Sequence, residues 1–300
     1  MSIPVIQFNQ HPSPGQAIDD CLHDLGFMQI SDFGIDNDLL KEVYDHSKAF
    51  FRADSSTKLS CQYRSAKENF GYQGLLEENL DPSAPADLKE TFTMRNILKG
   101  EIADERWPSV EFKQVMQRFY ANALEAGHIL QRAIAKHLNL DEEFFSSKHN
   151  GESISLRLLY YPARSPGSVI EHQLGAGAHT DYGFLTLLFQ DNVGGLQVLN
   201  QNDEWQDVVP QGNTVVVNSG DLLERWSNGH YRSTLHRVAP RINGKDRLSI
   251  AMFFDPDSPT WVEPLQSFIS DEYPCRYTAT TAGEHIQEKI QATHKKRFLE

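Results

Sequence analysis

Residues 175–188 read GAGAHTDYGFLTLL, which places His179 and Asp181 two positions apart, directly ahead of an apolar run. Such a run is typical of a buried strand. On a continuous strand, residues i and i+2 point to the same face, so both side chains could reach one metal ion while Thr180 points away. A polar turn that leads into a strand is the simpler interpretation of the same letters.

A third metal ligand has to come from another segment of the chain. Of the downstream histidines, His236 lies in STLHRV, inside an expected strand, whereas His230 lies in the turn SNGH; His285 and His294 are further away. Two histidines and one carboxylate are the ligand set of non-haem Fe(II) oxygenases, and they leave coordination positions open. Structural zinc usually takes four ligands that include sulfur, but a catalytic zinc site stays open from ligand identity alone.

The segment RLSIAMFF, residues 247–254, also carries polar residues at alternate positions of an apolar strand, Arg247 and Ser249. A buried arginine needs an anion, because an unpaired buried charge costs several kcal/mol. A guanidinium binds a carboxylate through two parallel hydrogen bonds, and a serine hydroxyl can add a third. The neighbouring expected strands offer no evident acid, so a small dicarboxylate is the expected partner.

The two halves of the chain have different patterns. After residue 150, short β-rich runs alternate with Gly- and Asn-containing turns, which is typical of an antiparallel sandwich or barrel. Earlier segments carry apolar residues at helical spacing, and DPSAPADLKETF, residues 81–92, is expected to be an exposed loop. We therefore predict a mainly β fold with flanking helices. The expected strands lie in 153–161, 184–189, 195–199, 213–218, 233–238 and 247–254, and the expected helices near 18–25, 36–53, 109–138 and 282–296.

The chain resembles the isopenicillin N synthase-like branch of the Fe(II)/2-oxoglutarate dioxygenases. The resemblance rests on three motifs in this order: the HTD at 179–181, the distal His236 in SNGHYRSTLHRV, and the RLS at 247–249. The flanking GGLQV and the KETF at 89–92 are similar as well, so the resemblance covers nearly the whole chain. It implies a double-stranded β-helix (jelly-roll) core with a C-terminal helical tail at 146–300. The helix-rich half, residues 1–145, would pack on this core as part of one structural unit.

The resemblance also implies residue roles. It assigns a catalytic iron to His179, Asp181 and His236, and the far carboxylate of 2-oxoglutarate to Arg247, Ser249 and Tyr161. Plant members of the family commonly have asparagine two positions before that tyrosine, where this chain has Leu159. This difference removes one hydrogen bond to the co-substrate and leaves its orientation less defined.

Residues for the primary substrate are less clearly marked. Arg157 has the same strand parity as Tyr161, so it could face the pocket and bind an acidic group of the substrate. Tyr72, Phe92 and Arg95 are candidates for the substrate mouth from the helical half, with ordinary packing or solvent exposure as the competing interpretation.

The expected reaction couples oxidative decarboxylation of 2-oxoglutarate by dioxygen to hydroxylation, desaturation or cyclisation of a small metabolite, with ascorbate as an optional reductant. Two alternatives stay open. One is an Fe(II) oxidase of the same fold that does not use 2-oxoglutarate, as in isopenicillin N synthase or aminocyclopropanecarboxylate oxidase. The other is a non-catalytic jelly-roll binding module.

The composition limits the partners. A formal net charge of −13 argues against nucleic acid and against anionic membrane surfaces, both of which attract basic proteins. The first residues are too polar for a signal peptide, and no apolar run approaches the roughly 18 residues of a membrane span. The 3 cysteines are scattered, which fits a reducing compartment. We expect a cytoplasmic protein, a monomer or weak homo-oligomer, that acts on a small molecule.

Overall fold

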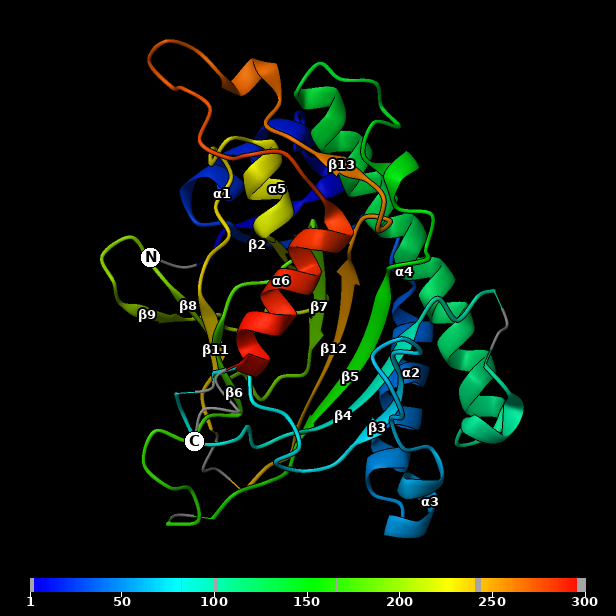
Figure 1. Ribbon diagram of the computed structural model, residues 1–300. Coiled ribbons are helices and arrows are strands. Elements are labelled where there is room, and N and C mark those ends of the chain that lie inside the picture. Colours follow the sequence, from blue (N-terminus) through cyan, green and yellow to red (C-terminus); the bar gives the residue numbers. More distant parts are fainter. Residues whose placement is uncertain (1–2, 82, 100–101, 166, 241–243, 296–300) are drawn as a thin grey trace.

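The computed structural model describes residues 3–81, 83–99, 102–165, 167–240 and 244–295, with side chains in the last helix described as far as residue 291. Within these ranges, eight strands form a main sheet in the order β1-β2-β10-β7-β12-β5-β4-β3, and four form a second sheet in the order β6-β11-β8-β9 (Figure 1). The main sheet contains β1 (Val5–Gln7), β2 (Phe27–Ser31), β3 (Phe70–Gln73), β4 (Glu90–Arg95), β5 (Ser155–Tyr161), β7 (Leu185–Gln190), β10 (Val215–Ser219) and β12 (Arg247–Phe254). The second contains β6 (Ala176–His179), β8 (Leu196–Leu199), β9 (Trp205–Asp207) and β11 (His236–Val238).

Helices cover one face of the main sheet (Figure 1). The long helix α4 begins after Ser109, whose hydroxyl accepts a hydrogen bond from the Phe112 N–H at 3.1 Å and so caps the helix. The predicted mainly β fold with flanking helices is confirmed. The helices are α1 (Pro14–Asp24), α2 (Asn37–Phe51), α3 (Ser55–Ser60), α4 (Val110–His137), α5 (Asp221–Trp226) and α6 (Ala282–Lys295), with 3-10 turns at Phe8–Gln10, Asp104–Arg106, Ser146–Lys148 and Gln266–Phe268; a small sheet pairs β13 (Trp261–Val262) with β14 (Thr280–Thr281).

Strand alternation divides the side chains of the main sheet between two environments. On β5, Leu158 packs in the large core under the helices, whereas Leu159 joins a smaller cluster with Ala176 and Val238 of the second sheet. Each fully buried aliphatic side chain of this kind contributes roughly 1.5–3 kcal/mol. The inner face of the sheet therefore lies against β6 and β11, where the candidate metal ligands are.

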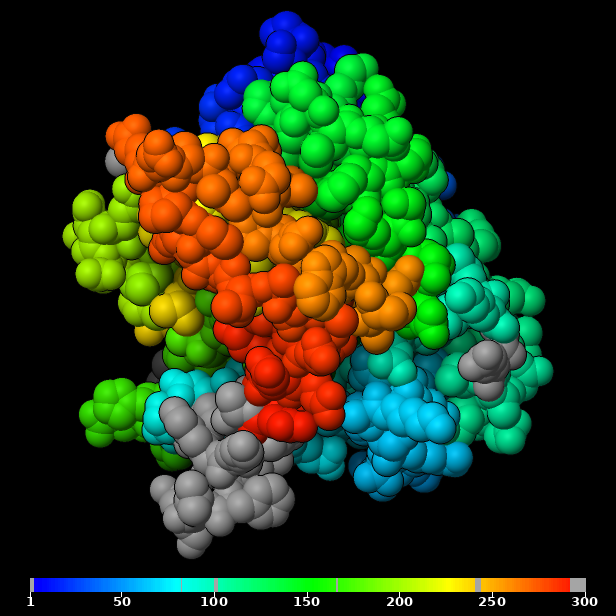
Figure 2. Space-filling view, turned by 45° about the horizontal axis from the view of Figure 1, so that its top comes forward, coloured from blue at the N-terminus to red at the C-terminus, as the bar shows by residue number. Residues whose placement is uncertain are grey.

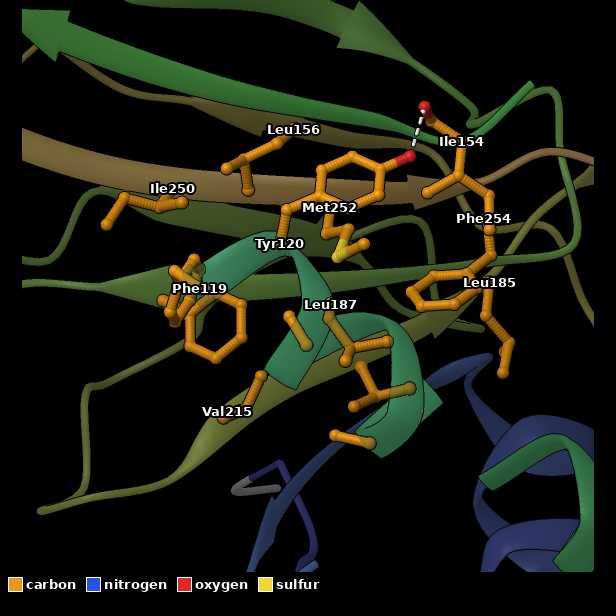
Figure 3. Packing of buried hydrophobic residues seen from close by; sticks show 14 of the residues in the cluster. Phe119, Tyr120, Ile154, Leu156, Leu185, Leu187, Val215, Ile250, Met252 and Phe254 are labelled. Atoms are coloured by element: carbon orange, nitrogen blue, oxygen red, sulfur yellow. Dashed lines mark hydrogen bonds between the residues drawn. The ribbon is translucent and has the colours of Figure 1, made fainter. Parts of the chain in front are cut away.

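Helix α4 approaches the sheet closely at Gly127, where a Cβ atom would clash with the ring of Phe254 on β12. The neighbouring side chains of this core are drawn in Figure 3, which also shows the Tyr120 hydroxyl donating to the Ile154 carbonyl at 2.9 Å. This contact fixes the start of β5 against α4, and thus fixes the strand that carries Tyr161.

Two expectations from the sequence need correction. The exposed loop expected at residues 81–92 is only partly right: residues 83–86 are exposed or half-buried and outside any strand, but Asp87, Leu88 and Lys89 are buried and the chain enters β4 at Glu90. In addition, the half expected to be helix-rich, residues 1–145, also contributes strands, because β1 to β4 belong to the main sheet. These strands have at most 6 residues and carry too few alternations for a clear pattern. Residue 296 of the expected last helix and the side chain of His294 lie outside the described part.

Helix α6, red in Figure 2, lies on the surface beside the orange segment that precedes it in the chain. The Lys289 Nζ lies 2.6 Å from the Asp221 carboxylate, and His285 Nε2 lies 3.7 Å from the same group. Asp221 begins α5, and its N–H donates to the Asp181 carbonyl. The C-terminal helix is thereby connected to the turn that carries Asp181. None of the described helices combines the length and apolarity that crossing a membrane requires.

His149 gives the fold a specific pH dependence. The imidazole is buried beside Phe184 and donates from Nδ1 to the Phe145 carbonyl at 2.8 Å. Burial lowers the pKa of His149 from 6.5 to about 4. The unfolded chain takes up this proton at a higher pH than the folded chain does, so stability should fall as pH drops from about 6.5 to about 4, by at most about 3 kcal/mol.

Urea unfolding of the metal-free protein at several pH values in this window measures how much His149 contributes to the pH dependence of the free energy of unfolding. His149→Asn should unfold with a shallower pH dependence than the wild type, whatever its stability at neutral pH. His46→Asn on α2 is the matched control and should keep the wild-type slope. Equal slopes for wild type and His149→Asn would contradict the assignment.

Candidate metal centre and co-substrate pocket

Three potential metal ligands converge between the two sheets. His179 is the last residue of β6, His236 is the first of β11, and the two are directly paired across the antiparallel ladder. Asp181 follows β6, and its Oδ1 lies 3.8 Å from His179 Nε2 and 3.6 Å from His236 Nε2. One ligand atom from each residue lies within 4.8 Å of the others, a spacing that could hold one metal ion.

The orientation of Asp181 is not the one expected from a continuous strand. Strand β6 ends at His179, so Asp181 lies in the turn before β7. Its Oδ2 accepts hydrogen bonds from the Thr186 hydroxyl at 2.6 Å and from the Asn218 side-chain amide at 2.7 Å. These two donors turn the other oxygen toward the imidazoles. Asn218 was not identified from the sequence. The signal that could have revealed it is a single amide side chain inside the otherwise apolar strand β10.

Each imidazole is held in one tautomer. His179 Nδ1 donates to the Gly177 carbonyl at 2.8 Å, and His236 Nδ1 donates to the Thr234 carbonyl at 3.1 Å. A carbonyl only accepts, so each Nδ1 carries the proton and each Nε2 presents a lone pair toward Asp181. Carbonyl partners of this type orient metal-binding histidines.

The charges also suit a metal. Burial lowers the pKa of His179, and the nearby His236 acts in the same direction, which favours the neutral ring. Burial alone would raise the pKa of Asp181, but the two imidazoles and the donors Asn218 and Thr186 bring it below its usual range. A neutral nitrogen ligand and an ionised oxygen ligand are the forms that bind a divalent cation.

Removal of the Asn218 amide should weaken metal binding without removing a ligand. Partners of metal ligands typically contribute about 10- to 100-fold in affinity, so Asn218→Ala should raise the Fe(II) dissociation constant by that factor. Anaerobic titration with Fe(II) measures it. Ser219→Ala is the matched control, because the Ser219 hydroxyl donates to the Arg232 carbonyl at 2.7 Å and not to a metal ligand. If Asn218→Ala binds Fe(II) as tightly as Ser219→Ala does, then the Asn218 amide does not support metal binding by Asp181.

Arg247 is the second feature of the site. Its side chain is 2% exposed, its Nη1 donates to Ser249 Oγ at 3.0 Å, and the guanidinium lies 4.8 Å from the centre of the Tyr161 ring. Within the described residues, its Nε and Nη2 have no hydrogen-bond partner. Two unsatisfied donors on a buried cation are suited to the two oxygens of a carboxylate.

A small cavity adjoins Arg247 and carries more positive charge. Arg164 and Lys245 line it together with Arg247, and Tyr161 and Val238 form part of its apolar wall. The local charge thus opposes the negative charge of the whole chain, which favours an anionic ligand. Arg164 was not identified from the sequence, because nothing in its loop marks it. Leu159 is paired opposite Ser249 and, being apolar, offers this pocket no hydrogen bond.

The candidate substrate residues have different positions. Arg157 donates to Glu78 Oε1 at 2.5 Å and to Thr93 at 3.1 Å, so its charge is already paired. Lys89, also buried, lies 2.5 Å from Asp87 and 3.4 Å from Glu78. The expected binding of an acidic substrate group by Arg157 therefore has to compete with Glu78.

Tyr72 and Phe92 are not brought to the metal ligands. Phe92 points from β4 into the core under the helices and packs edge-on against Phe50 at 5.1 Å. Tyr72 also packs in this core, and its hydroxyl donates to Glu90 at 2.5 Å. The reason is parity, since Thr93 on the other face of β4 contacts Arg157. Arg95 at the end of β4 is partly exposed and donates to the Lys67 carbonyl.

Comparison with known proteins gives matches over most of the chain. A family model described as the 2OG-Fe(II) oxygenase superfamily matches residues 153–256, and one described as the non-haem dioxygenase in morphine synthesis N-terminal matches residues 3–115. A 2-oxoglutarate-Fe(II) type oxidoreductase of Aspergillus fumigatus is 31% identical over 294 residues, which cover 93% of this chain and 87% of the relative.

Two further similarities concern proteins with a named small molecule. Homoarginine-6-hydroxylase 2-ODD-C23 of Glycine max is 33% identical over 292 residues, covering 92% of this chain and 87% of that protein. The crystal structure of a full-length Neurospora crassa protein in complex with alpha-KG and thymine superposes with a TM-score of 0.86 at 32% identity, covering 97% of each chain. Both similarities extend well beyond the region of the metal ligands.

Proposed function

The chain belongs to the Fe(II)/2-oxoglutarate-dependent oxygenase superfamily, and we propose that His179, Asp181 and His236 hold its iron. The predicted jelly-roll core, the cofactors and the oxidoreductase class are confirmed by its relatives. The observation that carries the assignment of the ligands is the convergence of two Nε2 atoms and one carboxylate oxygen within 4.8 Å. When bound, the iron supplies the oxidation of a C–H bond by dioxygen, coupled to decarboxylation of 2-oxoglutarate to succinate.

We propose that the far carboxylate of 2-oxoglutarate binds to Arg247 and Ser249, with Tyr161 beside them. The two unpartnered nitrogens of the buried guanidinium support this, because they lack the anion that a carboxylate provides. The apolar side chains between this end and the metal ligands, such as Leu159 and Ala251, would keep water away from the co-substrate.

The substrate is proposed to be a small polar metabolite, and hydroxylation to be the reaction. Support comes from two relatives, one named a homoarginine hydroxylase and one solved with thymine, both small nitrogen-containing compounds. We further propose a cytoplasmic enzyme that is a monomer or weak homo-oligomer. The free cysteines, of which Cys21 and Cys61 are buried, fit a reducing compartment.

The test begins with anaerobic protein, Fe(II) and 2-oxoglutarate, in which the ternary complex should show its weak visible charge-transfer band. On admission of dioxygen with a substrate, succinate should form in proportion to the oxygen consumed, with ascorbate added as an optional reductant. Product formation with oxygen uptake but no succinate would instead favour the 2-oxoglutarate-independent oxidase. Absence of the band and of succinate in iron-loaded protein would overturn the proposal.

A further inference from the structure

Asp255 continues the inner face of β12 beyond the end of the strand. Alternate residues of β12, including Ser249, Ala251 and Phe253, face the second sheet, and Asp255 is next in this series. Pro256 follows and favours an extended backbone at Asp255, which preserves the alternation. The Asp255 Oδ1 lies against the backbone of Gly183, so close that a Cβ atom at Gly183 would clash with it. The carboxylate is therefore beside the turn that carries Asp181.

Asp255 differs from the other acids on this side of the sheet because it lacks a partner among the described residues. Glu78 is paired with Arg157 and Asp87 with Lys89. Across the described part of the chain, no hydrogen bond or ion pair reaches the Asp255 carboxylate, and the residue is partly exposed. A half-buried acid that has no partner beside a candidate metal centre is suited to a group that the protein itself does not supply.

The natural partner of an unpaired carboxylate is a positively charged group. Burial raises the pKa of Asp255 to about 7, and the negative charge of Asp181 acts in the same direction, while Arg95 opposes both. Arg95 is at the end of β4, two strands away in the sheet, and forms no ion pair with Asp255. A cation placed next to Asp255 would stabilise its ionised form, and this attraction is strong where water is partly excluded.

We propose that Asp255 determines substrate specificity by binding a cationic nitrogen of the substrate, an ammonium or a guanidinium group. Phe253, the partly buried neighbour on the same face, would pack on the carbon chain next to that nitrogen. Binding at these two points would hold a C–H bond of the substrate near the metal ligands. The inference rests on the proposed function, because it names the substrate class for the same site.

The experiment compares a cationic and a neutral probe on the wild type and on Asp255→Asn, which removes the charge but keeps the shape. L-Homoarginine is the cationic probe and thymine the neutral one. Binding is measured anaerobically through the change that each probe causes in the visible band of the Fe(II)/2-oxoglutarate complex, and turnover through succinate. Asp257→Asn is the matched control, because Asp257 accepts from the Asn150 N–H and its own N–H donates to the Lys148 carbonyl.

Wild type should bind L-homoarginine more tightly than thymine. Asp255→Asn should weaken homoarginine binding by about 10- to 100-fold, as expected for loss of one member of a charge pair, and leave thymine binding unchanged. Asp255→Glu should recover part of the affinity, and Asp257→Asn should behave as wild type. Preference of the wild type for thymine, or an equal loss for both probes, would overturn the inference. The visible band and succinate formation would still report the proposed function separately.

Discussion

Replacement of His236 by alanine is expected to abolish stoichiometric iron binding and to lower succinate formation by about a thousandfold or more. Two of the proposed ligands, His179 and Asp181, would remain, and the loss of a metal that contributes several kcal/mol to catalysis accounts for a factor of this size. Iron content after anaerobic loading and gel filtration measures the first effect. The visible band of the 2-oxoglutarate complex and the rate of succinate release measure the second.

The control distinguishes loss of a ligand from loss of a histidine near the site. His172→Ala removes an exposed imidazole only seven positions before His179 and should keep full iron content. His236→Gln fills more of the buried space than alanine does, so a loss of iron in this variant as well is not explained by a folding defect. Full iron content with an undiminished band in either His236 variant would exclude His236 as a ligand.

Replacement of Arg247 by methionine is expected to raise the KM for 2-oxoglutarate by about a hundredfold or more, because loss of one partner of a buried charge pair costs about 2–5 kcal/mol. Without 2-oxoglutarate the variant should be no less stable than the wild type. In the free protein the guanidinium has Ser249 and the Tyr161 ring as neighbours, and two of its nitrogens are unsatisfied by any described residue. An apolar side chain of similar volume in such a place is often neutral or stabilising.

Thermal unfolding with and without 2-oxoglutarate tests both statements. The wild type should be stabilised by the co-substrate in proportion to its binding, and Arg247→Met should not be. Arg237→Met is the matched control, because its guanidinium stacks on Trp205 at 4.0 Å, away from the cavity. If Arg247→Met unfolds early without 2-oxoglutarate yet keeps the wild-type KM, then Arg247 has a structural role.

The sequence was most informative about candidate site residues whose ligand chemistry can be recognised from their type and from their spacing along one strand. His179, Asp181 and His236 have distinctive ligand chemistry, and Arg247 with Ser249 shows the two-residue period of a strand. The structure brings these residues to the same inner side of the two sheets. Tyr161 was assigned by resemblance, and the structure pairs it directly with Arg247.

The prediction was poorer where a residue's role depends on which face of an unrecognised strand it occupies. Residues 81–92 contain prolines and small residues, and this pattern concealed the start of β4. Phe92 and Tyr72 could not be assigned to the helical side without knowing the register of β3 and β4. Asn218, Glu78 and Asp255 come from distant segments, and their proximity to the metal ligands or to Arg157 depends on pairings between strands.

The sequence by itself determined the fold class, the candidate metal ligands and the basic partner expected for the co-substrate, because strand periodicity and ligand chemistry are properties of a few neighbouring residues. The tertiary structure alone decided which charges are paired and which are left for a ligand. Arg157 is neutralised by Glu78, whereas Arg247 and Asp255 are not neutralised by any described residue. The physical reason is that the strength of a charge depends on its partners and burial, and both are set by segments far apart in the chain.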